Sequence, residues 1–394
     1  MFLAKKIRLI PTKEQEILFW KSAGTARWAY NYFLAENQRV YDEEKRYLSG
    51  NELRKYINNT LKKTTHTWLS EVSANVMKHG VMDAEKALQN YFKGIGNKPK
   101  FKNKHKSIPS FYVNYESLVA KNGGFHGERI GYVKTSEPLP KINDKHYVDP
   151  RITYDGKYWY LSIGYKVEPI KQQLTDEVIG IDLGIKDLAI CSNGKKYQNI
   201  NKTQTVKYLK KKLKREQKKL SRMIECKIVD YKICGKKRYP IYSCNLQECK
   251  NIQKQRRKIK LIYRRLTNIR DNYIHQTTTE IVKTKPSQIV METLNIRGMM
   301  KNKHLSKAIS EQKFYEFKRQ IVYKSQLYGI QFIEVPMFYP SSKTCSVCGH
   351  IKQDLKLSDR IYKCSQCNSV IDRDINAAIN LANYVNRHKN STNY

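Results

Sequence analysis

Two apolar runs in the second half of the chain each carry a single carboxylate. Asp182 lies within the run 178–184, and Glu292 ends the run 289–292. Short apolar runs of this kind are typical of buried strands. A carboxylate there is costly to bury unless something positive meets it, and a metal ion held by oxygen ligands is a common solution. The chain is therefore expected to contain buried strands whose carboxylates bind a metal cation.

A third carboxylate, Asp374, stands at the head of a predicted amphipathic helix over 372–382. Asp372 competes with it, because one of the two is expected to cap the helix. Asp374 directly precedes Ile375 on the apolar face and is favoured as the ligand. Alone, each carboxylate has an ordinary explanation as a strand end or a helix cap. Together, the three predict a site for two Mg²⁺ ions that cuts phosphodiesters, with Asp182 bridging the ions.

The charge of the chain indicates a polyanionic partner. Its 394 residues, enough for two to four domains, include 75 Lys and Arg against 35 Asp and Glu, a net charge of +40. Such a surplus repels itself and favours nucleic acid over a merely soluble basic surface. No apolar stretch of about 18 residues and no secretory leader are recognisable. We expect no membrane contact and a cytoplasmic, nucleoid-associated protein.

Four of the nine cysteines form two Cys-x-x-Cys pairs. Cys345 and Cys348 are followed after 15 residues by Cys364 and Cys367. This spacing predicts a structural Zn²⁺ site, because four thiolates leave no open position for catalysis. A second group has irregular spacing, and it is interpreted as free thiols in an inserted loop, with a second zinc site as the alternative: Cys226, Cys234, Cys244 and Cys249.

The first 170 residues predict a β unit with a helical insertion. A strand over 2–10 is followed by helical spacing to about residue 92, and a basic hinge spans 93–102. From 108 to 168 the apolar period becomes two, with a hairpin turn at Asp155-Gly156. The strand at the start is expected to complete this β unit.

The remaining chain predicts an α/β region with a basic helical hairpin over 203–283. Strands are expected at 287–292 and 331–335, and a helix between them at 306–328. Two arms of like charge favour a polyanion partner over a solvated face. The cations proposed to contact nucleic acid on the arms are Lys210, Lys211, Lys214, Arg215, Arg256 and Arg257.

These motifs resemble the TnpB family of transposon-encoded RNA-guided nucleases. The resemblance is carried by Gly-Ile-Asp-Leu-Gly at 180–184, by the strand ending at Glu292, and by the cysteine segment that runs from 341 to 378. Residues 25–31 also resemble the family's first recognition helix, which adds Arg27, Tyr30 and Asn31 as nucleic-acid contacts. The resemblance spans nearly the whole chain, and the insertion at 226–249 is its main departure.

The resemblance implies a multidomain fold of α+β and α/β type. Its expected parts are a split, wedge-like β-barrel (1–10 and 105–170), an inserted helical recognition domain (11–104), a RuvC-type, RNase H-like nuclease domain (175–340 and 371–394) and an inserted zinc ribbon that binds target nucleic acid (341–370). Two roles are open for the aromatic residues of the helices, core packing or base stacking: Trp20, Trp28, Tyr30 and Tyr91.

The resemblance also implies the partners and the reaction. A guide RNA from the transposon end would direct cutting of double-stranded and single-stranded target DNA at Asp182, Glu292 and Asp374. A positively charged channel would hold the RNA–DNA duplex by its backbone. The alternatives are a nuclease-inactive, RNA-guided repressor, which is expected to lack one of the acids, and an accessory transposase.

Overall fold

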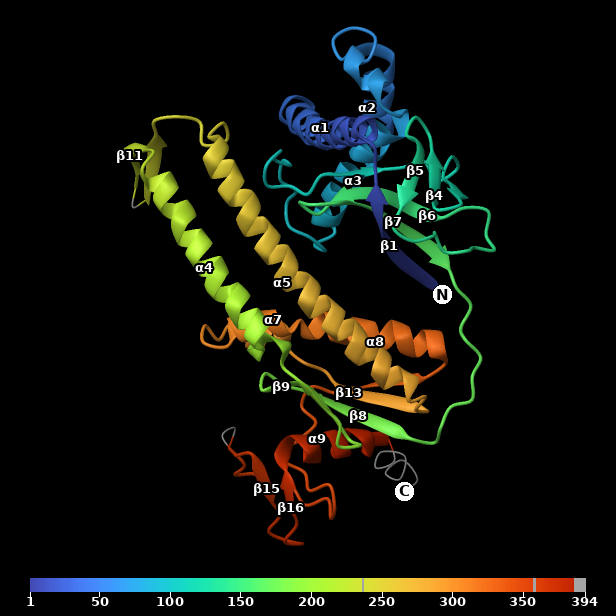
Figure 1. Ribbon diagram of the computed structural model, residues 1–394, viewed down its shortest axis with the longest axis vertical. Helices are drawn as coiled ribbons and strands as arrows, with labels where there is room; N and C mark the ends of the chain where they lie inside the picture. Colours follow the sequence, from blue (N-terminus) through green and yellow to red (C-terminus); the bar gives the residue numbers. More distant parts are fainter. Residues whose placement is uncertain (236, 357–358, 386–394) are drawn as a thin grey trace. The chain divides into compact units, whose positions relative to one another are not determined.

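The computed structural model describes residues 1–235, 237–356 and 359–385, which form two compact units (Figure 1). One unit comprises Phe2–Val167, and the other begins at Glu168. Each unit is treated by itself. No helix in the described residues is long and apolar enough to cross a membrane.

The first unit is built on a seven-stranded sheet in the order β2-β6-β7-β1-β5-β4-β3. Strand β1 lies in the middle, pairing with β7 along most of its length and with β5 at its end. The strands are β1 (Phe2–Ile10), β2 (Ser110–Tyr112), β3 (Val119–Lys121), β4 (Gly124–Gly127), β5 (Gly131–Thr135), β6 (Val148–Tyr154) and β7 (Trp159–Lys166). The predicted first strand and the hairpin at Asp155-Gly156 are confirmed, and the Asp155 carboxylate accepts the N–H groups of Lys157 and Tyr158 at 2.9 Å.

Helices fill the sequence between β1 and β2. Helix α1 begins with a capping box, in which Thr12 and Gln15 satisfy each other's backbone N–H groups. The helical segments are α1 (Lys13–Glu44), α2 (Gly50–Tyr56), a π-helical turn (Ile57–Leu61), a 3-10 turn (Thr67–Glu71) and α3 (Ala74–Phe92). Their apolar faces form a core of their own around Phe33, Ile57 and Val81. The helical pattern predicted up to about residue 92 is confirmed, and it is interrupted after Glu44 and after Leu61.

The second unit is built on a five-stranded sheet in the order β10-β9-β8-β13-β14. Its strands are β8 (Val178–Leu183), β9 (Asp187–Cys191), β10 (Lys196–Gln198), β13 (Gln288–Glu292) and β14 (Gln331–Val335). Strands β8, β13 and β14 run parallel, while β9 runs antiparallel to β8. The predicted strands at 287–292 and 331–335 are confirmed.

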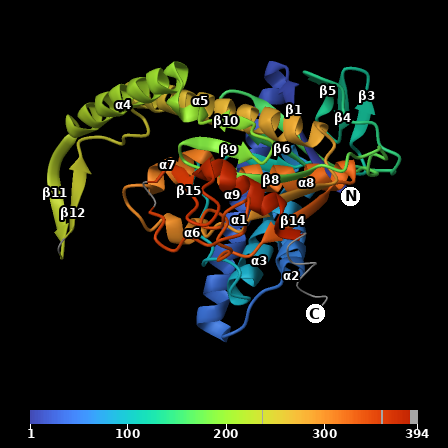
Figure 2. The same ribbon diagram turned by 90° about the horizontal axis from the view of Figure 1, so that it is seen from below.

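Helices cover both faces of this sheet (Figures 1 and 2). Ile179, Ile181 and Met291 face a core shared with α5 (Lys250–Lys283) and α8 (Phe314–Tyr328). The alternate residues of the same strands face α9 (Arg373–Ala382), and Val290 packs there against Leu381. Because side chains alternate along a strand, Asp182 and Glu292 belong to the face that α9 covers.

The predicted pair of basic arms is confirmed as α4 (Gln204–Glu225) packed against α5. The arms project from the sheet and carry β11 (Ile228–Cys234) and β12 (Lys237–Tyr242) at their far end (Figure 2). The prediction of an inserted loop at 226–249 was therefore wrong for most of this insertion. Alternating β-branched and aromatic residues form a hairpin there.

The predicted single helix over 306–328 is two helices, α7 (Ser306–Gln312) and α8. Lys313 breaks it with a left-handed backbone (φ 54°), and its ammonium group pairs with Asp271 of α5. The short helix α6 (Ile296–Met299) precedes them, and the two-stranded ribbon β15 (Ile361–Lys363) and β16 (Val370–Asp372) leads into α9.

Candidate active site

Asp182 and Glu292 lie at the ends of two neighbouring parallel strands. The register of β8 and β13 pairs Ile181 with Met291, so the two carboxylates occupy the next position of the ladder and share one face. Asp374 lies in the first turn of α9, which packs on that face. The fold therefore brings three distant segments of the sequence to one edge of the sheet.

The three acids interact electrostatically. Burial raises the pKa of Asp182 well above its ordinary value, and the charges of Glu292 and Asp374 raise that pKa further, while Arg373 opposes the shift. Burial also raises the pKa of Glu292. A cluster of acids whose ionisation is disfavoured by burial and mutual repulsion is stabilised by a bound cation. The donor set, three carboxylates, matches the oxygen ligands that Mg²⁺ prefers.

Asp372 and Asp374 have different partners. The Asp372 carboxylate caps α9 by accepting the N–H groups of Asp374 at 3.0 Å and Ile375 at 3.2 Å, and it forms an ion pair with Lys196 at 3.0 Å. Asp374 has Arg360 at 3.8 Å. One of the two acids thus caps the helix, as expected, and the capping residue is Asp372.

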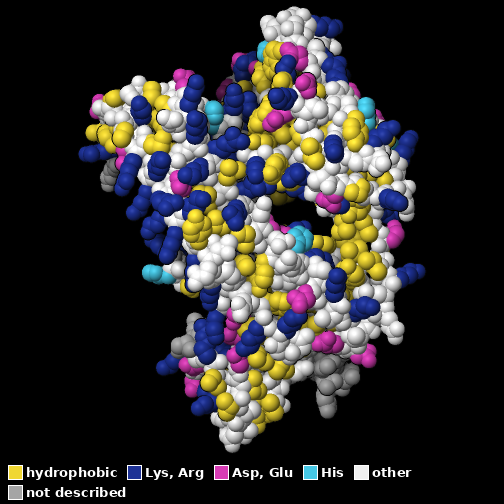
Figure 3. Space-filling model, viewed as in Figure 1, with side chains coloured by type: hydrophobic (Ala, Val, Ile, Leu, Met, Phe, Trp, Pro, Cys, Tyr) yellow, Lys and Arg dark blue, Asp and Glu magenta, His cyan; other side chains and the backbone are white. Residues whose placement is uncertain are grey.

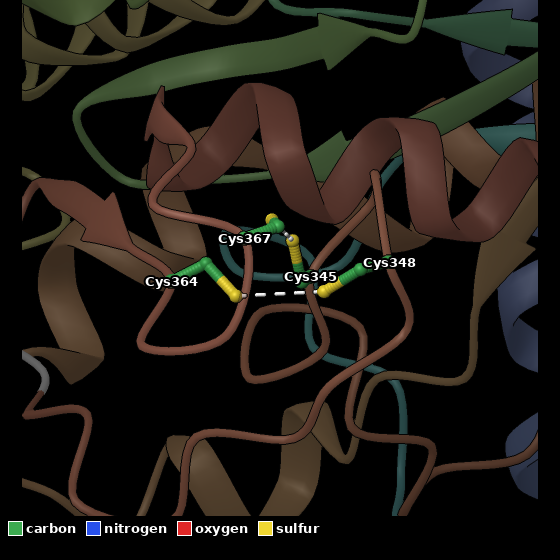
Figure 4. Close-up of side chains that lie close together, drawn as sticks. All are labelled: Cys345, Cys348, Cys364 and Cys367. Atoms are coloured by element: carbon green, nitrogen blue, oxygen red, sulfur yellow. Dashed lines mark hydrogen bonds between the residues drawn. The ribbon is translucent and has the colours of Figure 1, made fainter.

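The four predicted zinc ligands converge at one point (Figure 4). The Sγ atoms of Cys345 and Cys367 lie 3.7 Å apart, and those of Cys348 and Cys364 lie 3.5 Å apart. A tetrahedral ion with Zn–S bonds of about 2.3 Å places its sulfurs about 3.8 Å apart. The cluster therefore has the donors and the spacing of a structural zinc site.

This cluster is more compact than the group of carboxylates. Within the part of the chain that the structure describes, the four cysteines are the only group of three or more His, Cys, Asp or Glu residues whose ligand atoms all lie within 4.8 Å of one another. The three acids do not form such a group among these described residues. Of the other cysteines, Cys244 and Cys249 approach to 3.2 Å, but no second cluster of three ligands occurs in this described part.

Two buried asparagines of α9 connect the cysteine cluster to the carboxylate site. Asn376 donates to the Thr344 carbonyl at 2.7 Å and accepts the Ser346 N–H at 2.9 Å. Asn380 donates to the Ser341 and Thr344 carbonyls at 2.8 and 2.6 Å. Asn376 and Asn380 were not predicted as positioning residues. Their spacing of four on an alanine-rich helix was the available signal, because asparagine is a poor helix former.

The residues predicted to contact nucleic acid fall into two groups. Lys211, Lys214 and Arg215 are exposed on one face of α4 and line an open groove of about 860 Å³. Arg257 is exposed on α5, and Arg256 is half-buried there. Figure 3 shows Lys and Arg side chains gathered along these arms. We name the stripe on α4 the basic stripe; its members are Lys211, Lys214, Arg215, Lys218, Lys219 and Arg222.

The other predicted contacts are engaged within the protein. Lys210 pairs with Glu311. Tyr30 is 7% exposed, and the Nζ atom of Lys102 lies 3.8 Å from the centre of its ring. Asn31 exchanges two hydrogen bonds with the backbone of Lys102, at 2.7 and 2.9 Å. Tyr30 and Asn31 thus hold the loop around Lys102. Arg27 and Lys102 both line a pocket of about 100 Å³.

Three sequence families match successive parts of the chain. The family described as "Helix-turn-helix domain" matches residues 1–46, "Probable transposase" matches 162–232 and 235–303, and "Cas12f1-like, TNB domain" matches 314–381. A "Putative RNA-guided DNA endonuclease" of Streptomyces pristinaespiralis is 27% identical over 96% of this chain and 88% of that protein. "TnpB-like protein L79" of Acanthamoeba polyphaga mimivirus is 25% identical over 96% and 72%, respectively. The chain belongs to the TnpB family.

A solved structure shows that the TnpB chain shares its fold with a known effector. The Cas12f1 chain in a complex with sgRNA and target DNA superposes with a TM-score of 0.55 at 17% identity, covering 94% of this chain and 83% of that one. At this identity the likeness establishes the mixed α/β fold alone. The fold class is confirmed at that level.

Proposed function

We propose that this TnpB chain is an RNA-guided DNA endonuclease of a transposon, which hydrolyses target DNA at Asp182, Glu292 and Asp374. The observation that carries the proposal is the placement of the half-buried Asp182 beside Glu292 on one sheet face, with Asp374 in the first turn of the helix that covers this face. The names of its relatives and the net charge of +40 support it. In a prokaryotic cell this activity belongs to the cytoplasmic nucleoid.

The domain division proposed for this function follows the sequence expectation. Residues 1–10 and 105–170 are the wedge-like barrel, 11–104 the recognition domain, 175–340 and 371–394 the RuvC-like nuclease domain, and 341–370 the zinc ribbon. Support comes from the parallel arrangement of β8 and β13 and from α9, which returns to the same sheet after the cysteine segment.

Asp182, Glu292 and Asp374 would hold two Mg²⁺ ions. Bound there, the ions supply charge neutralisation at the phosphate, a more acidic attacking water and stabilisation of the leaving oxygen. The protein contributes the rest. Strand β8 holds Asp182 beside Glu292 of β13, on the sheet face that α9 covers. Asp372 fixes the start of α9 by accepting two backbone hydrogen bonds. The basic stripe would hold the nucleic-acid backbone.

The test is cleavage by the purified ribonucleoprotein. The protein is isolated from cells that express its locus, the bound RNA is sequenced, and linear DNA matching its variable end is added with Mg²⁺. We expect cutting by the wild type and none by Asp182→Ala, with RNA and DNA binding retained. Loss of nucleic-acid binding in that variant would contradict the assignment of Asp182 to the metal site.

The transposase alternative is supported by the family description that matches 162–232 and 235–303. Strand joining would appear as covalent donor–target products in the same assay. Their formation would favour a transposase, and free cut ends without joined products favour the endonuclease. The repressor alternative loses support because all three acids are present.

A further inference from the structure

A groove lined with aromatic rings lies at one end of the helices in the first unit. It encloses about 390 Å³ between the end of α1, the loop 45–49, the end of α3 and the segment 98–101. Its main walls are Tyr41, Tyr47, Tyr91, Phe92, Phe101 and Lys98. None of these residues belongs to a core cluster of the unit.

The rings are exposed although they contact one another. Tyr41 and Tyr47 are stacked at 4.9 Å between ring centres, and Phe92 meets Tyr47 edge-on at 4.8 Å. Yet Tyr47 is 47% exposed, Phe92 53% and Phe101 64%. Exposed rings of this size do not gain the favourable free energy of burial. Binding of a ligand that covers them would therefore be favourable.

The walls of the groove are held in place by contacts within the protein. Asn37 is buried, and its side-chain oxygen accepts the Leu48 N–H at 2.9 Å, which fixes the loop that carries Tyr47. The ring centre of Tyr91 lies 5.6 Å from that of Phe92, so Tyr91 joins the same group of rings. Walls held by such contacts lose little conformational entropy when a ligand binds.

A strongly basic segment adjoins the groove. The segment 93–106 holds six lysines and no acidic residue. Lys98 lines the groove itself, and Lys45 lies over the Tyr41 ring at 5.5 Å. Aromatic rings beside a run of cations are the usual means of binding unpaired bases together with their phosphates. An apolar protein segment would not require the lysines.

The size of the groove favours RNA over a DNA strand. Its volume lies near the lower end of the range for small-ligand pockets, about 300–1,000 Å³. Binding tracks for continuous single strands hold about 4–16 nucleotides, which need a longer surface. Bases splayed out from a folded RNA are instead bound one or two at a time on aromatic side chains.

We propose that this groove binds one or two unpaired bases of the RNA carried by the protein, stacked on Tyr47 and Phe92, with the adjoining phosphates near Lys98. The inference rests on the proposed function, because it takes the bound RNA as the ligand. It adds a specific contact for a structured part of that RNA.

The experiment measures the affinity of the full-length protein for the RNA that co-purifies with it. Tyr47→Leu removes the ring but keeps an apolar side chain, and Tyr47→Phe keeps the ring. Tyr115→Leu is the matched control, since Tyr115 is 39% exposed in the same unit but its hydroxyl donates to Glu116. We expect Tyr47→Leu and Phe92→Leu to weaken RNA binding about 5- to 150-fold, while Tyr47→Phe and Tyr115→Leu bind as the wild type does. Ultraviolet crosslinking should join groove residues to unpaired nucleotides.

The outcomes separate this inference from the proposed function. If the wild type carries no enriched RNA, both fail. If the wild type binds its RNA and a folded Tyr47→Leu binds it equally well, only the groove assignment fails. Unchanged RNA affinity with weaker binding of target DNA would assign the groove to DNA and overturn the proposal. Equal melting temperatures of the variants establish that they are folded.

Discussion

Gly180 of β8 lies directly against the backbone of Ala378 in α9. A Cβ atom at Gly180 would stand 2.0 Å from the Ala378 carbonyl oxygen and 2.5 Å from the Ala382 nitrogen. Real side chains do not approach backbone so closely, so only glycine lets the helix lie at this distance from the strand. Two residues further along β8 is Asp182, which shares this face with Asp374.

Gly180→Ala is expected to move α9 and to destabilise the second unit by about 1–3 kcal/mol through overpacking. Thermal unfolding measures the change, and DNA cleavage should fall with it because Asp374 moves. Gly24→Ala is the control, since a Cβ there meets nothing within 4 Å and alanine favours the helix by about 0.5–1 kcal/mol. Equal stability of Gly180→Ala and the wild type would show that α9 adjusts freely.

Asp182→Asn should stabilise the protein when no Mg²⁺ is added and zinc is retained. The folded-state pKa of Asp182 is raised, so its contribution to stability is fully present below the unfolded-state pKa of about 3.9. That contribution is lost as the pH rises through the folded-state pKa. We expect the melting temperature of the variant to exceed that of the wild type by a few degrees at neutral pH. The difference should shrink at acid pH, and a constant difference would argue against titration of Asp182.

Asp374→Asn and Asp372→Asn should separate catalysis from helix capping. The first removes a proposed metal ligand and is expected to lower the cleavage rate at least about 100-fold with little change in melting temperature. The second keeps a good capping residue and should cut at a rate near that of the wild type. Asp372→Ala should cost about 1 kcal/mol of stability. The reverse pattern of rates would identify Asp372 as the ligand.

Zinc content should depend on the cluster at 345–367 alone. We expect one zinc per chain by elemental mass spectrometry, with its loss and a lower melting temperature in Cys345→Ser. Although burial opposes it, hydrogen bonds from the Ser369 hydroxyl and from the N–H groups of Cys348 and Val347 lower the pKa of Cys345 to about 6. Cys226→Ser is the control and should keep the full zinc content. Two zinc ions per wild-type chain would show that the other cysteines also bind metal.

The basic stripe should dominate the salt dependence of nucleic-acid binding. Lys214→Gln and Lys218→Gln each remove an exposed cation, so the slope of log affinity against log salt should fall by about 0.7–0.9 for each phosphate that the variant no longer neutralises. Lys210→Gln is the matched control, because Lys210 is already paired with Glu311. Equal slopes for Lys214→Gln, Lys218→Gln and the wild type would move the binding surface away from α4.

The sequence predicted the strands of the second sheet well, because β8 and β13 are apolar runs whose carboxylates stand out. It did not predict the ribbon β11–β12, because Gly235 and Pro240 are typical of a loop and proline is rare inside a strand, although Pro240 lies within β12. It also missed the break at Lys313, since neither glycine nor proline marks it. The contacts of Asn376 and Asn380 join residues about 30 to 40 positions apart, and local patterns carry no information on such pairs.

The position of β1 has a consequence for biosynthesis. This strand leaves the ribosome before its two neighbours, β5 and β7, which are completed only at residues 135 and 166. The helices that follow β1 form most of their contacts with residues nearby in the sequence. The central strand β1, by contrast, pairs with strands that lie more than a hundred residues later. Loop closure over such distances is slow, so β1 remains unpaired for much of the synthesis of this unit. An unpaired strand is prone to aggregation during this time.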